Sequence, residues 1–149
     1  YYPPGGTMTT QEENKELVRR SNEEVWDKGN LEFLDGYVAE DYVEYNSASP
    51  EPIRGPDGYK QNVEMVRSAF PDMSVTTEDL IAEGDKVVTR YTLTGTHQNP
   101  FMGIEPTGNE IEIEGISIGR LEDGKVVEGW SNIDVMSMMQ QLGVVEPPA

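Results

Sequence analysis

The spacing of apolar residues changes once along this chain, and the change limits the folds open to it. Before residue 71, apolar side chains such as Tyr59, Val63 and Val66 recur every three or four positions, which is the spacing of one helix face. After residue 73, β-branched residues and alternation of apolar with polar positions predict strands. The pattern therefore predicts helices followed by antiparallel strands, an α+β protein.

Three helices are predicted in the first half of the chain. Thr10 and Glu13 fit a capping box at the start of the first helix. Asn30 can cap a second, short helix. Pro56 lies at a favourable early position of the third helix, and Pro71 ends it.

Two hairpins and one more helix are predicted in the second half. A turn at residues 83–86 returns the chain on itself, and Asp123-Gly124 is a strong signal for a two-residue hairpin loop. A terminal helix follows from about residue 135 and is stopped by Gly143. These elements predict a curved antiparallel sheet with three to four helices packed on one face, which leaves a pocket between the layers.

One long strand changes phase along its length. Ile111 and Ile113 occupy odd positions, whereas Ile116 and Ile118 occupy even ones. Because side chains of a strand alternate between its two faces, we predict a β-bulge at residues 114–115 that bends the strand.

The length of 149 residues suits a single domain. We expect residues 1–10 to be an extension outside the fold, residues 11–145 to form the domain, and residues 146–149 to be a loose tail. The start of the chain has neither the basic nor the apolar region of a signal peptide, and no long apolar run follows. The chain is therefore expected to be cytoplasmic, with no membrane partner.

Charge and composition exclude several functions. The 28 acidic and 11 basic residues give a net charge of -17, which repels phosphate backbones, so no nucleic-acid partner is expected. The scattered acids are typical of the surface of a halophilic protein. With no cysteine and a single histidine, thiolate chemistry and metal sites built from cysteines or several histidines are excluded, so metal catalysis would have to rest on carboxylates alone.

Two polar residues are candidates for chemistry, and each has two interpretations. Asp134, between the last strand and the last helix, can cap that helix through the N–H of Ser137, or it can serve as a general acid/base whose pKa an apolar cavity raises. His97, at a strand end, can be structural, or its imidazole can polarise a substrate oxygen.

Aromatic residues are numerous enough to wall a pocket for a flat ring, although ordinary core packing explains each of them equally well. The candidate substrate-binding residues are Tyr45, Asn46, Tyr59, Phe70, Tyr91, Phe101, Trp130 and Asn132.

Several segments in order along the chain resemble one known family. They are Ala69-Phe70-Pro71-Asp72, Gly95-Thr96-His97, Asp123-Gly124-Lys125 with Trp130 and Asp134, and Gln141-Leu142-Gly143. In their order and spacing these segments resemble the SnoaL-like polyketide cyclases of the NTF2-like superfamily, from about residue 12 to residue 143. The resemblance implies a cone of curved sheet covered by helices.

The resemblance also implies a chemistry. In cyclases of this family, the aspartate of the terminal Trp-to-Asp segment acts as acid/base in closing a carbon–carbon ring, without metal or organic cofactor. Carried over, that role falls on Asp134, with His97 as the neighbour that polarises the substrate carbonyl. The chain departs from many relatives at Tyr45 and Asn46, near which they have a histidine.

Three functional hypotheses follow, since one scaffold can host several functions. The first is a cofactor-independent cyclase or isomerase acting on a hydrophobic carbonyl compound. The second is a protein that binds a small hydrophobic or aromatic molecule without catalysis. The third is an assembly module that uses its exposed sheet face, and a homodimer or homotetramer is expected under all three.

Overall fold

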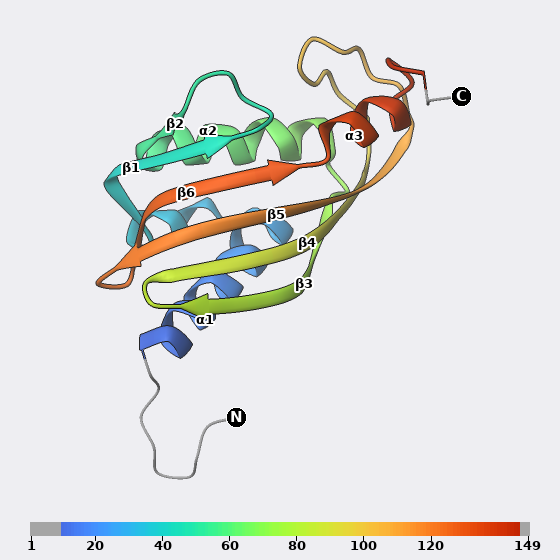
Figure 1. Cartoon of the computed structure of the whole chain (residues 1–149). Coiled ribbons are helices and arrows are strands. Elements are labelled where there is room, and N and C mark those ends of the chain that lie inside the picture. Colours follow the sequence, from blue (N-terminus) through green and yellow to red (C-terminus); the bar gives the residue numbers. More distant parts are fainter. Residues whose placement is uncertain (1–9, 147–149) are drawn as a thin grey trace.

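The structure, a computed structural model, describes residues 10–146 (Figure 1). The predicted extension and tail lie outside these residues, apart from Thr10, which begins the first helix, and Glu146. Within the described part, no helix is both long and apolar enough to cross a membrane.

The predicted helices and hairpins follow one another in the predicted order, and two further strands lie between the second and third of these helices. The elements are α1 (Thr10–Ser21), a π-helix η1 (Asn22–Asp27), a 3₁₀-helix η2 (Leu31–Gly36), β1 (Val38–Asn46), β2 (Ile53–Arg54), α2 (Gly55–Ala69), β3 (Ser74–Glu83), β4 (Lys86–Thr96), β5 (Glu110–Glu122), β6 (Lys125–Ile133) and α3 (Val135–Gln141).

The strands form one open, six-stranded sheet in the order β2-β1-β6-β5-β4-β3. Figure 1 shows the sheet curving in front of α1 and α2, so the expected α+β layout is confirmed. The sheet is antiparallel, as predicted, except between β1 and β6, which pair in parallel with Tyr45 opposite Trp130. The two strands are far apart in sequence, so no turn between them reveals their direction.

The predicted helices begin and end close to the prolines and capping residues that were expected to bound them. α2 has Pro56 in its first turn and ends before Phe70 and Pro71. α1 continues into η1, where the N–H of Lys28 bonds the carbonyl oxygen of Glu23 five residues earlier at 3.0 Å. This wider π-turn closes the first helical segment, which the spacing of apolar residues alone does not distinguish from an α-helix.

The bulge predicted at residues 114–115 is wrong. β4 and β5 pair without any register shift, and Gly115 lies opposite Tyr91. The change of phase instead reflects a strand that is apolar on both faces: Ile113 is buried on the inner face, whereas Ile116 is 49% exposed. The register shift of β5 lies further along, opposite β6, between Arg120 and Leu121.

The core lies between the helices and the inner face of the sheet, in two clusters. One gathers around Val25, Leu34 and Val63, and the other around Phe70 and Ile113. Trp26 packs against both clusters. Full burial of each such side chain stabilises the fold by roughly 1.5–3 kcal/mol. Packing in the two clusters therefore holds the helices against the sheet.

Candidate active site

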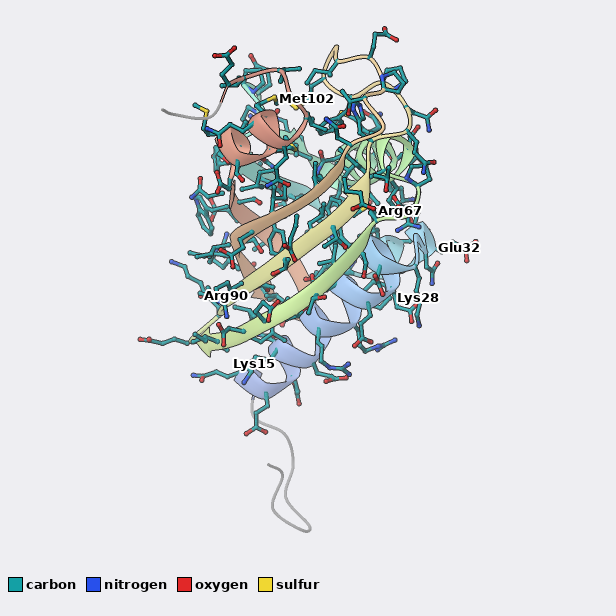
Figure 2. All side chains as sticks on the ribbon, turned by 90° about the vertical axis from the view of Figure 1, so that its right-hand side faces the viewer. Lys15, Lys28, Glu32, Arg67, Arg90 and Met102 are labelled. Atoms are coloured by element: carbon teal, nitrogen blue, oxygen red, sulfur yellow. The ribbon has the colours of Figure 1, made fainter. Side chains whose placement is uncertain are left out.

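A cavity of about 460 Å³ lies between the helices and the inner face of the sheet, a size typical of small-molecule sites. Its wall is mainly apolar and draws on almost every element. The lining residues include Trp26, Ile53, Tyr59, Met65, Val66, Phe70, Val75, Tyr91, Leu93, Phe101, Met102, Ile111, Ile113, Ile133 and Met138. Met102 lies at the end of the molecule formed by α3 and the β4–β5 loop (Figure 2), and it is 46% exposed, so the cavity meets solvent there.

The half-buried Glu44 is the one carboxylate among the described residues that line this cavity. The hydroxyl of Tyr42 donates to its Oε1 at 2.8 Å, and Nδ2 of Asn46 donates to its Oε2 at 3.0 Å. All three residues alternate along β1 on its inner face. The two donors hold the carboxylate in a fixed orientation.

Tyrosine hydroxyls surround the same region. Burial raises the pKa of Tyr59 to about 12, and the neighbouring Glu44 carboxylate adds to the shift. Burial, followed by the charge of Glu44, likewise raises the pKa of Tyr42 well above its usual value. For Tyr91, burial and Glu44 outweigh the hydrogen bond with Ser131, and its pKa is raised too. At neutral pH these phenols keep their protons and can donate hydrogen bonds.

Two strand glycines make room for these tyrosines. A Cβ atom at Gly129 would lie 2.7 Å from the Tyr42 hydroxyl oxygen and 3.5 Å from Cγ of Glu44. A Cβ atom at Gly115 would overlap the ring and hydroxyl of Tyr91. The absence of side chains at these positions therefore lets polar groups lie against the floor of the cavity.

A smaller chamber of about 60 Å³ adjoins the cavity. Asn22, Glu44, Tyr59 and Ser117 line both spaces, so Glu44 lies at their boundary. Other residues of the chamber, including Thr89, are polar as well. A polar space of this size can hold ordered water, because one water needs only about 10–15 Å³ of such volume.

Asp134 has the geometry of a helix cap. Its Oδ1 accepts a hydrogen bond from the N–H of Ser137 at 3.0 Å in the first turn of α3. The side chain is exposed and does not line the cavity, although Ile133 and Met138 on either side of it do. The structure thus supports the capping interpretation that the sequence left open.

His97 is fully buried behind the cavity wall. Its Nδ1 accepts from the N–H of Thr107 at 3.2 Å, and its ring packs 5.5 Å from that of Phe70, which lines the cavity. Nε2 has no hydrogen-bond partner within residues 10–146. Neither His97 nor Asp134 is part of the described cavity wall, and no hydrogen bond or ion pair between them is present in that part of the chain.

The predicted substrate-binding residues divide into three groups. Those on the cavity wall are Asn46, Tyr59, Phe70, Tyr91 and Phe101. Tyr45 and Asn132 are exposed and lie on the opposite face of the sheet, because each is adjacent in its strand to an inward-facing residue. Trp130 borders the smaller chamber, and the Lys86 ammonium group lies 5.6 Å from its ring centroid.

Several polar residues of the wall were not among the sequence-based candidates. They are Asn22, Glu44, Ser49, Asn62, Ser117 and Ser131. Glu44 could have been found from the period of two that joins it to Tyr42 and Asn46. No comparable signal marks the others, since they meet only through pairing between distant segments. Among residues 10–146, no group of three or more His, Asp or Glu side chains is arranged to hold a metal ion.

The sequence profile of the SnoaL-like polyketide cyclases matches residues 16–142. The chain therefore belongs to this family. Among its relatives, the aklanonic acid methyl ester cyclase AcmA of Streptomyces galilaeus is 27% identical over 80% of this chain and 84% of its own length. The nogalonic acid methyl ester cyclase of Streptomyces nogalater is also 27% identical, over 80% of this chain and 90% of its own length.

Solved structures share the fold. A SnoaL-like protein of Jannaschia sp. CCS1 superposes with a TM-score of 0.84 at 24% identity, covering 97% of this chain and 100% of its own. IdmH from Streptomyces antibioticus superposes with a TM-score of 0.76 at 32% identity, covering 87% of this chain and 98% of its own. The SnoaL-like fold inferred from the sequence motifs is thus confirmed.

Proposed function

We propose that this chain is a cofactor-independent cyclase or isomerase that acts on a hydrophobic, polyketide-like carbonyl compound in the cavity. The observation that carries the proposal is the cavity of about 460 Å³, whose apolar wall holds a few convergent polar groups. Membership of the SnoaL-like family supports it, as do the two relatives named as methyl ester cyclases.

The chemistry needs only groups that the chain itself carries. A carboxylate removes a proton from the carbon beside a carbonyl, and the resulting enolate closes a ring by attacking a second carbonyl. Neutral hydroxyls such as those of Tyr59 and Tyr91 can donate to the developing oxyanion, and the apolar wall limits competing water. The product has the same mass as the substrate, because the proton is returned.

The sequence-based hypothesis assigns the acid/base role to Asp134 and the polarising role to His97. For Asp134 this role requires the carboxylate to leave the Ser137 N–H and turn toward the cavity. For His97 this role requires that its ring reach the substrate beyond Phe70, whose own ring packs against His97 and lines the cavity. Asn caps a helix about as well as Asp, so Asp134→Asn separates the charge from the cap. Lost turnover at an unchanged melting temperature supports the hypothesis, whereas retained turnover excludes it.

The proposed function is tested directly with the substrates named for the relatives. Purified protein is incubated with aklanonic or nogalonic acid methyl ester and with simpler apolar β-keto esters, and products are separated by chromatography and weighed by mass spectrometry. We expect a new product of unchanged mass from at least one of them, formed faster than without protein. Binding of these compounds without any product would contradict the proposal.

The second candidate function is binding without catalysis. It is favoured by the geometry of Asp134, whose carboxylate is used in the helix cap outside the cavity. This alternative predicts that apolar ring compounds raise the melting temperature but remain chemically unchanged. The product assay above therefore separates the two functions.

A further inference from the structure

We infer that Glu44 is the catalytic base of the cavity. In this role it takes the proton from the carbon beside a substrate carbonyl and returns it to the ring-closed product. The inference rests on the proposed function and goes beyond it, because neither the family motifs nor the sequence-based candidates include this residue.

The first argument is position. Glu44 lies on the inner face of β1, and no other Asp or Glu among residues 10–146 lines the cavity. Each carboxylate oxygen accepts one hydrogen bond, from Tyr42 or from Asn46, which leaves a lone pair on each oxygen for a proton. Gly129, directly opposite Glu44 in the parallel β1–β6 pair, keeps the space beside its Cγ open.

The second argument is charge. Glu44 is half-buried, and a carboxylate that is removed from water is usually paired with a cation. No described Lys, Arg or His lines the cavity, and no ion pair in the described part of the chain includes Glu44. Its partners are a neutral hydroxyl and a neutral amide. An unpaired carboxylate facing an apolar space remains available as a base.

The third argument is the path of the proton. The chamber of about 60 Å³ meets the cavity at Glu44, and its wall includes hydroxyls of Ser21, Thr89 and Ser117. Water held there would let the proton on Glu44 exchange with solvent while the enolate exists. The large cavity thus receives the substrate, and the small chamber has room for water beside the base.

The step balances without any co-reactant. The C–H bond beside the carbonyl breaks, its proton joins the Glu44 carboxylate, and the electron pair moves into the enolate. The enolate carbon then bonds to a second carbonyl carbon, whose oxygen becomes an alkoxide. Protonated Glu44 gives the proton to that oxygen, so the carboxylate is restored.

Glu44→Gln tests the inference, because it removes the charge at nearly constant shape. We expect kcat/KM on the cyclised ester to fall about 10²- to 10⁴-fold, the usual contribution of a general base. The Kd for the same ester, measured by thermal shift, should stay within about threefold. Glu40→Gln is the matched control, since Glu40 is an exposed carboxylate on the same strand, and it should keep wild-type turnover.

The outcomes separate this inference from the function on which it rests. Full turnover in Glu44→Gln, with an active wild type, overturns the role of Glu44 alone. A wild type that binds esters but converts none overturns the proposed function and this role together. If Glu44→Gln fails to fold, Glu44→Asp decides: we expect at least a tenfold loss of turnover from withdrawing the carboxylate by one methylene, and wild-type turnover would overturn the role.

Discussion

Glu44 and Asp134 are both carboxylates near the ends of strands, and their surroundings favour different roles. Asp134 is exposed and accepts a backbone N–H at the start of α3. Glu44 faces an apolar cavity with only neutral partners. The sequence predicted the position of Asp134 well, because strand-to-helix junctions favour Asp. It could not show that Glu44 faces a cavity, since that depends on how β1 pairs with β6 and packs against the helices.

Removing the Asp134 cap should cost stability. Asp134→Ala leaves the Ser137 N–H without its side-chain partner, and we expect the free energy of unfolding to fall by about 1 kcal/mol. Asp134→Asn should change it by only a few tenths of a kcal/mol, because Asn caps equally well. Urea denaturation of the three proteins measures both values. Equal stability of Asp134→Ala and the wild type would contradict the capping role.

The buried tyrosines should make stability fall at alkaline pH. The pKa of Tyr59 is raised to about 12 in the folded protein, chiefly by burial, from a usual value of 10.0. Its contribution to the free energy of unfolding is therefore complete below pH 10. As the pH rises from there toward 12, up to about 3 kcal/mol of this contribution is lost.

Tyr59→Phe tests this expectation, because phenylalanine has no proton to lose. Between pH 9 and 11 its free energy of unfolding should fall less steeply than that of the wild type. Chemical denaturation at several pH values measures the two slopes. Parallel slopes would show that Tyr59 ionises equally easily in the folded and unfolded protein.

At the scale of elements, local signals predicted the structure well wherever they were strong. Asp123 and Gly124, with φ values of 49° and 78°, form the predicted tight hairpin loop. Pro56 starts α2 as expected. The errors came from long-range features. The parallel pairing of β1 with β6 has no local signature. A bulge was predicted at residues 114–115 because a strand that is apolar on both faces mimics a change of phase.

Gly115 should be required for the shape of the cavity. In Gly115→Ala the added methyl overlaps the Tyr91 ring, which must move, and we expect a loss of about 1–3 kcal/mol in the free energy of unfolding. Gly119→Ala on the same strand is the control, because its methyl meets Val126 at an ordinary 3.5 Å.

A double-mutant cycle identifies the cause of that loss. When Tyr91→Leu removes the ring, Gly115→Ala should cost clearly less than it does beside Tyr91. Thermal or urea unfolding of the four proteins gives the coupling energy. If Gly115→Ala costs the same in both backgrounds, its effect arises from the strand backbone and not from the ring.

At the scale of the whole molecule, charge is the dominant property. The net charge of -17 on 149 residues means that the acidic side chains repel one another. Exposed ion pairs, such as that of Lys28 with Glu24, offset little of this repulsion. Figure 2 shows charged side chains on the outside of the molecule, including Lys15 on α1, Lys28 after η1 and Arg90 on β4. The acids thus surround a cavity whose wall is largely apolar.

Salt should therefore stabilise the protein. Raising NaCl from about 0.05 to 0.5 M shortens the screening length severalfold, and we expect the melting temperature to rise by several degrees. Differential scanning calorimetry measures the shift, with sucrose of equal osmolality as the uncharged control. A melting temperature that falls with salt would show that attractive ion pairs outweigh the repulsion.

The central claim is that the cavity performs proton transfer beside a carbonyl, and hydrogen exchange tests it most directly. An apolar β-keto ester that binds the protein but is blocked from closing a ring is incubated in D₂O and followed by NMR. We predict that the wild type incorporates deuterium at the carbon beside the carbonyl well above the background rate, and that Glu44→Gln does not. Background exchange in the presence of saturating wild-type protein would contradict the account.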